Sequence, residues 1–163
     1  MQTVTRTEAK RAFVLADMLK GAPFSSIEVF QPLFATEKSR VEKLSDAELD
    51  SIIARDPIRL QNYNKVTWKL DHIMLGACSV YPRMGGREWA KGSVCDVAER
   101  FKRMEPLGSR IWMMKNFSIV FEVQLPILVL TKGSEFHIDD GSHRAVAMAL
   151  CGIKKVAAWI GEP

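Results

Sequence analysis

Six consecutive residues near the C-terminus carry most of the groups in this sequence that could do chemistry together: Asp139, Asp140, Gly141, Ser142, His143 and Arg144. An apolar run at 136–138 comes before them and predicts a strand, and the Ala/Met/Leu-rich stretch after them predicts a helix. Backbone N–H groups at a helix N-terminus point outward, and the helix dipole favours negative charge there. A strand that ends in a glycine turn and opens a helix is therefore a place where phosphate groups can bind.

The residue types in this turn suit a phosphate ligand. Gly141 allows a tight turn, and Ser142 and His143 lie at or near the expected N-cap, where they can offer side-chain donors. Arg144 can make a two-pronged contact with a phosphate group. Spacing alone supports a purely structural interpretation equally well. In that interpretation Ser142 is only a helix cap, His143 is a polar neighbour, and Arg144 forms a surface ion pair with Asp140.

Alternation along the predicted strand places His137 and Asp139 on one face and Phe136 and Ile138 on the other. The two adjacent carboxylates then fall at the carboxyl end of the strand, where open α/β sheets usually hold their ligands. Two imidazoles and a carboxylate, from His137, Asp139 and His143, could also form a transition-metal site. We favour that alternative less, because the spacing is loose.

The composition is that of an ordinary globular protein. With 163 residues, 47% of them hydrophobic and 26% charged, the chain predicts one domain over residues 1–163. The net charge of +4 permits a polyanionic partner without requiring one. The three cysteines have no metal-type spacing and predict reduced thiols in a cytoplasmic protein. We expect no membrane insertion, because no apolar run could span a bilayer and the N-terminus lacks the apolar segment of a signal peptide.

Apolar patterning divides the chain into a helix-rich part, about residues 1–105, and a strand–turn–helix–strand part, about 117–161. The Ser/Thr-x-x-Glu segments at 5–8 and 45–48 have the spacing of capping boxes. The two parts are expected to share one sheet, which gives an α/β (α+β) fold. The expected helices are 6–20, 45–55, 64–75 and 93–104, and the expected strands are 27–30, 117–123, 125–130, 136–138 and 156–160.

Basic residues gather between residues 82 and 103 as well as in the turn. Residues 82–92 are irregular and rich in glycine, and their basic and aromatic side chains would suit a mobile loop that touches an anion or a nucleobase. A surface loop with one anchoring tryptophan is the simpler interpretation, and we favour it. Arg110 and Trp112 are expected in the connection to the strand at 117–123. The residues that could form a basic surface for DNA are Arg83, Arg87, Lys91, Arg100, Lys102 and Arg103.

The C-terminal pattern resembles the ParB/sulfiredoxin superfamily, whose members carry a Gly-x-His-Arg or Gly-Glu-Arg-Arg box at this place and use it to bind nucleotide phosphates. The resemblance implies a small mixed sheet flanked by several helices. It also implies a nucleotide phosphate-binding box made of Gly141, Ser142, His143 and Arg144. The positions that carry the resemblance are Pro126, Ile127, Val129, Phe136, Ile138, Asp140, Gly141, Ser142, His143, Arg144, Ala147 and Gly152, followed by an apolar strand.

Departures from the superfamily pattern narrow what the resemblance implies. Sulfiredoxin has a cysteine where this chain has Ser142, and without that thiolate the repair of peroxiredoxin sulfinic acid is excluded. Ala145 follows Arg144, so the second arginine of the ParB box is absent. We expect no site-specific centromere binding, because neither a helix-turn-helix module nor a dimerisation tail follows before Pro163.

The whole sequence is also similar to plasmid-encoded oncogenic-suppression factors of this superfamily, which inhibit fertility. That similarity implies a bacterial, cytoplasmic enzyme that binds and hydrolyses ATP, degrades DNA and blocks DNA transfer by type IV secretion. Its catalytic residues would be Asp139, Asp140, His143 and Arg144. Asp139 or Asp140 would hold Mg²⁺ or orient the attacking water. Two alternatives stay open: a non-enzymatic inhibitor that binds a secretion or coupling protein, and a small-molecule phosphotransferase.

Overall fold

A six-stranded mixed sheet forms the centre of the computed structural model, which describes residues 2–21, 26–82, 90–104, 109–116 and 125–163. The strand order is β1-β2-β6-β4-β5-β3. Strand β4 runs parallel to β6, and β3 runs parallel to β5, whereas the other neighbours are antiparallel. The strands are β1 (Gln2–Val4), β2 (Thr67–Met74), β3 (Cys78–Ser79), β4 (Ile127–Lys132), β5 (Glu135–Asp140) and β6 (Lys155–Glu162).

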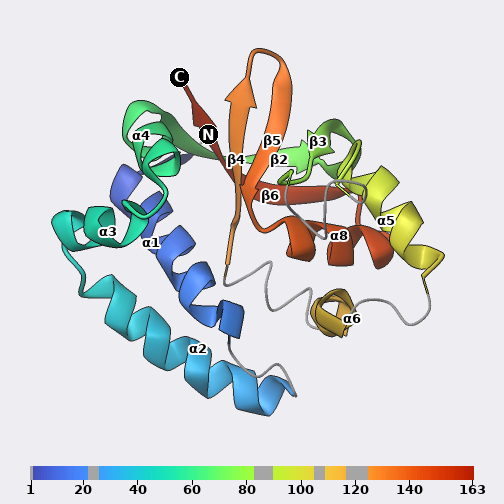
Figure 1. The fold of residues 1–163 in the computed structure, drawn as a ribbon, viewed down its shortest axis with the longest axis horizontal. Coiled ribbons are helices and arrows are strands. Elements are labelled where there is room, and N and C mark those ends of the chain that lie inside the picture. The colour runs from blue at the N-terminus through green and yellow to red at the C-terminus, as the bar shows by residue number, and fades with distance from the viewer. Residues whose placement is uncertain (1, 22–25, 83–89, 105–108, 117–124) are drawn as a thin grey trace.

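Helices cover the two faces of this sheet (Figure 1). On one side lie α1 (Arg6–Met18), α2 (Ile27–Glu42), α3 (Asp46–Ile53) and α4 (Pro57–Lys65). On the other lie α5 (Val94–Lys102), α6 (Ser109–Asn116) and α8 (Ser142–Leu150). Two 3₁₀ turns, η1 (Leu19–Gly21) and η2 (Leu75–Ala77), follow α1 and β2. Among the described residues, no helix is both long enough and apolar enough to cross a membrane.

The hydrophobic core consists of two clusters, one on each face of the sheet. Along β4, Ile127 and Val129 belong to the cluster with α5 and α8, whereas Leu128 and Leu130 belong to the cluster with α1 to α4. All four side chains are buried, because a strand covered on both faces alternates between two apolar environments. The carboxyl end of β5 lies beside this strand, and its side chains therefore reach helices on both sides of the sheet.

Several local predictions are confirmed. Thr5 and Glu8 form a capping box at the start of α1, and Ser45 and Glu48 form one at the start of α3. The strands expected at 125–130, 136–138 and 156–160 are present as β4, β5 and β6, and α8 follows the glycine turn. Ser93 caps α5, as expected. These signals are confirmed because each depends on residues close together in the sequence.

The strand predicted at 27–30 is wrong, because these residues begin helix α2. The side chain of Ser26 accepts a hydrogen bond from the backbone of Val29 and caps that helix. Phe30, Phe34 and Val41 repeat at helical spacing and are buried in the same core cluster as the apolar side chains of α1, with which α2 packs. Pro32 lies inside the helix at the loss of one backbone hydrogen bond, and the packing of this apolar face outweighs that loss.

The helix predicted at 64–75 is also wrong, because α4 ends at Lys65 and strand β2 follows. Helix α3 ends at Ile53, and Pro57 is the first residue of α4, which Asp56 caps. Trp68 and Ile73 are an odd number of residues apart, so on a strand they face opposite sides and enter different core clusters. The tertiary pairing of β2 with β1 and β6 thus overrides the helical pattern.

Two further predictions concern the region between α5 and β4. Arg110 and Trp112, which were expected in the connection to residues 117–123, lie in helix α6, a helix that the sequence analysis did not predict. The strand predicted at 117–123 lies outside the described residues. The described part of this region is important for the site, because α6 packs against α8.

Candidate functional site

The turn between β5 and α8 has the geometry that the sequence predicts. Gly141 is the N-cap of α8 and has φ of +98°, in the left-handed region where glycine is favoured. A Cβ atom at this position would lie 2.9 Å from Nη2 of Arg144. The first N–H groups of a helix have no partner within it, and Gly141 has no side chain that could cap them. The turn therefore presents backbone donors at a positive helix end.

Arg144 holds this turn together from inside the protein. Its Nη2 donates to Oδ2 of Asp140 at 2.9 Å, and its Nη1 donates to the backbone oxygens of Leu125 and Pro126, the latter at 3.0 Å. The side chain is only 4% exposed. The ion pair with Asp140 that the structural interpretation predicts is therefore present, but it is buried and not on the surface.

Ser142 is the first residue of α8 and follows the N-cap Gly141, so its expected place at or near the N-cap is confirmed, whereas the interpretation of Ser142 as the helix cap itself is wrong. Its Oγ accepts a hydrogen bond from the backbone N–H of Tyr81 at 2.8 Å, and the residue is 5% exposed. Tyr81 lies just after β3, at the edge of the sheet. Ser142 therefore fixes the chain that leaves β3 to the start of α8.

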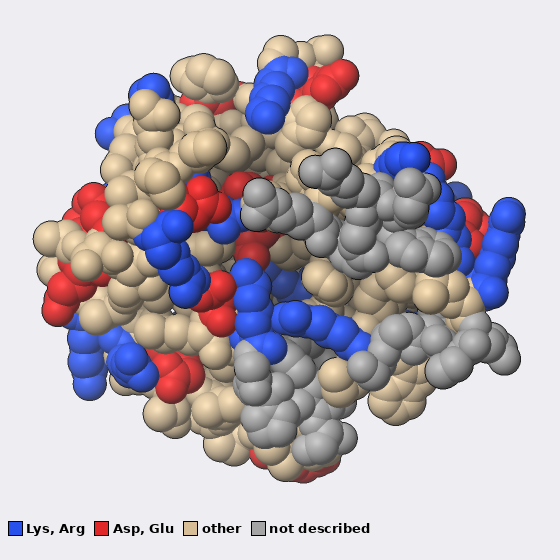
Figure 2. All heavy atoms as spheres, in the orientation of Figure 1, with Lys and Arg blue, Asp and Glu red and all other residues tan. Residues whose placement is uncertain are grey.

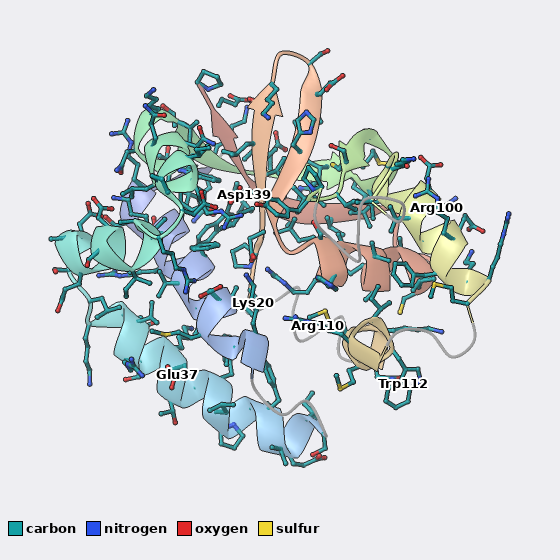
Figure 3. The ribbon with its side chains drawn as sticks, in the orientation of Figure 1. Lys20, Glu37, Arg100, Arg110, Trp112 and Asp139 are labelled. Atoms are coloured by element: carbon teal, nitrogen blue, oxygen red, sulfur yellow. The ribbon has the colours of Figure 1, made fainter. Side chains whose placement is uncertain are left out.

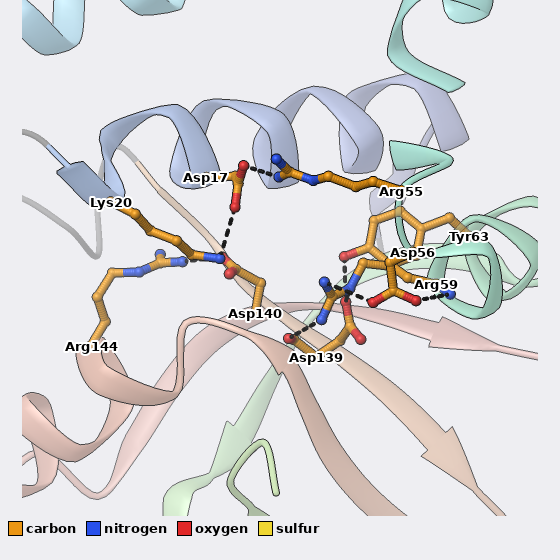
Figure 4. A network of polar contacts seen from close by, with 9 residues as sticks. All are labelled: Asp17, Lys20, Arg55, Asp56, Arg59, Tyr63, Asp139, Asp140 and Arg144. Atoms are coloured by element: carbon orange, nitrogen blue, oxygen red, sulfur yellow. Dashed lines mark hydrogen bonds and ion pairs between the residues drawn. The ribbon is translucent and has the colours of Figure 1, made fainter. Parts of the chain in front are cut away.

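Asp139 faces the other side of the sheet, where Figure 4 shows its partners. Its Oδ2 accepts hydrogen bonds from the hydroxyl of Tyr63 at 2.7 Å and from Nε of Arg59 at 2.9 Å. Burial raises the pKa of Asp139, while the Arg59 charge and the Tyr63 hydrogen bond act in the opposite direction. The Arg59 guanidinium also lies 4.6 Å from the ring centroid of Phe13. Asp139 and Asp140 therefore have separate cationic partners on opposite faces of β5.

His137 lies on the Asp139 face and not near the glycine turn. Its Nδ1 is 2.7 Å from Oγ of Ser79, and its Nε2 is 3.1 Å from Oε2 of Glu135. His143 is on α8, so the structure does not bring the two histidines together with Asp139. In the part of the chain that the structure describes, no group of three or more His, Cys, Asp or Glu side chains is placed to hold a metal ion.

A small pocket of about 50 Å³ opens at the N-terminus of α8. Two cationic side chains extend into it from elements far away in the sequence, Lys20 from η1 and Arg110 from α6 (Figure 3). Nζ of Lys20 is 3.0 Å from a carboxylate oxygen of Asp17, which also pairs with Arg55. The residues that line the pocket are Ala16, Leu19, Lys20, Arg110, Met114, Leu125, Asp140, Gly141, Ser142, His143 and Arg144.

Arg110, which lines this pocket, has an unsatisfied side-chain donor. Its Nε is buried, and among the described residues it has no hydrogen-bond partner. A buried donor without a partner is uncommon in folded proteins and indicates a missing acceptor, such as water, an ion or a ligand. The remaining polar groups of the pocket wall are mostly donors or cations, so an anion is the acceptor that fits.

The pKa of His143 is lowered by the surroundings of this pocket. Burial is the main reason that its pKa falls to about 4, and the charge of Arg110 lowers it further. The charge of Asp140 acts in the opposite direction. The imidazole is therefore neutral near pH 7 and can accept a hydrogen bond, while its surroundings disfavour a positive charge on it.

Lys20 and Arg110 are the site residues that the sequence analysis missed. Each lies far along the chain from the glycine turn, and no local pattern marks either of them as a ligand-binding residue. Figure 2 shows Lys and Arg atoms close together in the middle of the same face of the molecule, with acidic atoms beside them. Lys20 and Arg110 come close to the start of α8 only in the tertiary structure.

The described candidate DNA-binding residues lie on or beside α5, away from the pocket at α8. Lys91 and Arg103 are exposed beside or at the end of α5, and Arg100 lies on that helix, away from Arg110 (Figure 3). Acidic residues share the helix, and Nζ of Lys102 is 2.6 Å from Oε1 of Glu99. The described part of this surface therefore carries both signs of charge. Arg83 and Arg87 lie outside the described residues.

Comparison of the chain with models of protein families, with curated proteins and with solved structures gives no match.

Proposed function

We propose that this protein binds a nucleotide through its phosphates at the N-terminus of α8 and hydrolyses it. The observation that carries the proposal is the unsatisfied Nε of Arg110, which lies with Lys20 beside the uncapped amide groups of the helix. Helix N-termini and cations together favour phosphate. By the measure in which one water needs about 10–15 Å³, the pocket of about 50 Å³ has room for a phosphate group but not for a nucleoside.

The structure changes the roles that we assign to the box residues. Arg144 supports the turn through Asp140, so in this proposal the backbone of residues 142–144, Lys20 and Arg110 contact the phosphate. The pKa of His143 lies well below 7, so its imidazole is neutral near pH 7 and can accept a hydrogen bond that orients an attacking water. The strand, left-handed glycine and helix support the proposed relationship to the ParB/sulfiredoxin fold.

The proposed nucleotide is ATP, accompanied by Mg²⁺. Carboxylate oxygens suit this ion. Asp140 lines the pocket, and its ion pair with Arg144 uses Oδ2. Asp140 is therefore the better placed of the two candidate carboxylates, since Asp139 faces Arg59 on the other side of β5. Bound Mg²⁺ would supply neutralisation of charge on the phosphates.

By similarity to the oncogenic-suppression factors, we further propose that nucleotide hydrolysis accompanies DNA degradation and blocks type IV transfer of DNA from a bacterial cell. The net charge of +4 supports contact with DNA without specifying a sequence. Lys91, Arg100 and Arg103 are the candidates for contacts with the DNA backbone among the described residues.

The test compares three ligands by calorimetry: ATP, tripolyphosphate and adenosine, each with Mg²⁺. We expect ATP and tripolyphosphate to bind and adenosine not to bind. Arg110→Gln should weaken binding of both phosphates about tenfold or more, because it removes a charge-assisted hydrogen bond. Arg103→Gln, which removes an exposed arginine outside the pocket, is the matched control and should leave the binding of ATP and tripolyphosphate unchanged. Equal binding of adenosine and ATP, or unchanged binding by Arg110→Gln, would contradict the proposal. Hydrolysis of ATP is then tested by measuring the release of phosphate, and degradation of DNA by following the cutting of plasmid DNA.

One observation favours a second candidate, the non-enzymatic inhibitor of a secretion or coupling protein. All the described contacts of the Arg144 guanidinium are internal, as expected of a box that is a feature of the fold. The two functions separate in a transfer assay. If Arg110→Gln loses ATP binding but still blocks DNA transfer, the inhibitor is the better description.

A further inference from the structure

A second pocket, of about 510 Å³, lies between helices α1 and α2 and the sheet. Its volume falls in the range of about 300–1,000 Å³ that is usual for small-molecule sites. The two helices lie side by side on this face of the molecule (Figure 1). The residues that line the pocket are Glu8, Arg11, Ala12, Leu15, Lys38, Val41, Glu42, Leu70, Leu125, Pro126, Ala157 and Trp159.

The floor of this pocket is apolar and only partly covered. Leu70 of β2 and Ala157 and Trp159 of β6 present their side chains on the same face of the sheet, and all three are half-buried. Ala12 and Leu15 of α1 form the adjoining wall. A half-covered tryptophan beside aliphatic side chains favours an apolar, preferably aromatic ligand, because such a ligand removes their surface from water.

Arg11, at the rim, has an unsatisfied donor. Its Nη2 donates to the backbone oxygen of Leu44 at 3.1 Å, which fixes the guanidinium. Its Nε is buried and has no hydrogen-bond partner among the residues that the structure describes. A fixed arginine with an unused N–H at the edge of an apolar pocket matches a ligand that ends in an anionic oxygen.

The other charges at the rim limit the ligand to a single negative charge. Glu8 accepts hydrogen bonds from the backbone and side chain of Thr5, each at 2.7 Å, and remains ionised because these bonds lower its pKa. Glu42 is 3.9 Å from Nζ of Lys38. Two carboxylates near the opening disfavour a doubly charged phosphate, whereas a monocarboxylate next to Arg11 carries less repulsion.

We propose that this pocket binds a small monocarboxylate with an apolar or aromatic body. The body lies against Trp159 and Leu70, and the carboxylate accepts a hydrogen bond from Nε of Arg11. This site differs in chemistry and place from the phosphate pocket, with which it shares only Leu125 among the described lining residues. It does not depend on the proposed nucleotide-binding function.

The test uses two ligands of the same shape, 2-naphthoate and the neutral 2-naphthalenemethanol, and measures their dissociation constants by calorimetry. Arg11→Gln should weaken naphthoate binding about tenfold or more, the effect of losing a hydrogen bond to a charged group, and leave naphthalenemethanol unchanged. Unchanged binding of the neutral ligand also shows that the variant is folded around an intact pocket. The matched control is Arg6→Gln, because Arg6 is also on α1 and donates to a backbone oxygen, that of Val66, but does not line the pocket.

A second variant tests the location. Ala157→Leu adds bulk to the sheet side of the pocket and should weaken the binding of both ligands. A ligand that lies against Trp159 should also change the tryptophan fluorescence of the protein. Trp159→Phe should remove this change and preserve the affinity within a few fold. The proposal is overturned if naphthoate does not bind at millimolar concentration. It is equally overturned if Arg11→Gln and Arg6→Gln weaken naphthoate to the same extent, or if Ala157→Leu binds both ligands as the parent protein does.

Discussion

Replacement of Arg144 by alanine should destabilise the whole protein, and not only a ligand site. The variant leaves the Asp140 carboxylate, in a residue that is 9% exposed, without its guanidinium partner. It also removes the donor to the backbone oxygens of Leu125 and Pro126. Breaking a buried ion pair by removing one partner costs about 3–5 kcal/mol. That is a large share of the roughly 5–15 kcal/mol by which a domain is usually stable.

Urea unfolding, followed by circular dichroism and by tryptophan fluorescence, measures this loss. The double variant Asp140→Ala with Arg144→Ala should be less destabilised than the sum of the two single variants, because it leaves no unpaired charge. Arg103→Ala, at an exposed position, is the control and should change the free energy of unfolding by less than about 0.5 kcal/mol. If Arg144→Ala costs under about 1 kcal/mol, the guanidinium does not hold the turn, and a role in contacting phosphate becomes the better explanation.

Two further predictions concern the same turn. The folded state keeps His143 neutral down to about pH 4, whereas its unfolded pKa is about 6.5, so the unfolded state binds the proton first and stability falls as the pH drops through this window. Between pH 7 and pH 4 the free energy of unfolding of the parent protein should fall by at most about 3 kcal/mol more than that of His143→Gln. If the two proteins lose the same free energy of unfolding, the pKa of His143 is not depressed. Gly141→Ala places a Cβ 2.9 Å from Arg144 at φ +98°, whereas Gly133→Ala, at φ +62°, meets nothing within 4 Å. Denaturation should therefore show Gly141→Ala to be the more destabilised, by about 1 kcal/mol or more beyond the strain that the two positions share.

The parts of the fold that the sequence predicted are those held by short-range contacts. The capping boxes at Thr5 and Ser45 join residues three apart, and the turn at Gly141 depends on one backbone conformation. Residues 27–30 and 67–74 were misassigned, because their state is decided by what they pack against. Pro32 disfavours a helix at this place, but the packing of Phe30 and Phe34 keeps it in α2.

The candidate site shows the same division. Gly141 and the start of α8 could be placed from the sequence, as could the pairing of Asp140 with Arg144 at a spacing of four residues. Lys20 and Arg110 could not be placed in this way. Lys20 precedes Arg110 by about 90 residues, and Arg110 precedes the glycine turn by about 30, so only the tertiary fold brings them together. Burial of Arg144 also depends on the distant segment before β4, whose backbone oxygens accept its hydrogen bonds.

Leu125 stands between the two pockets, since it belongs to the wall of each and its backbone oxygen is bound to Arg144. A ligand that moves this residue from one side alters the wall of the other pocket. The two binding equilibria are then thermodynamically linked, and linkage is reciprocal. The factor by which a carboxylate changes the affinity for a phosphate must equal the factor by which the phosphate changes the affinity for the carboxylate. If both proposed ligands bind, the contact between Arg144 and Leu125 would let the binding of one ligand regulate the binding of the other.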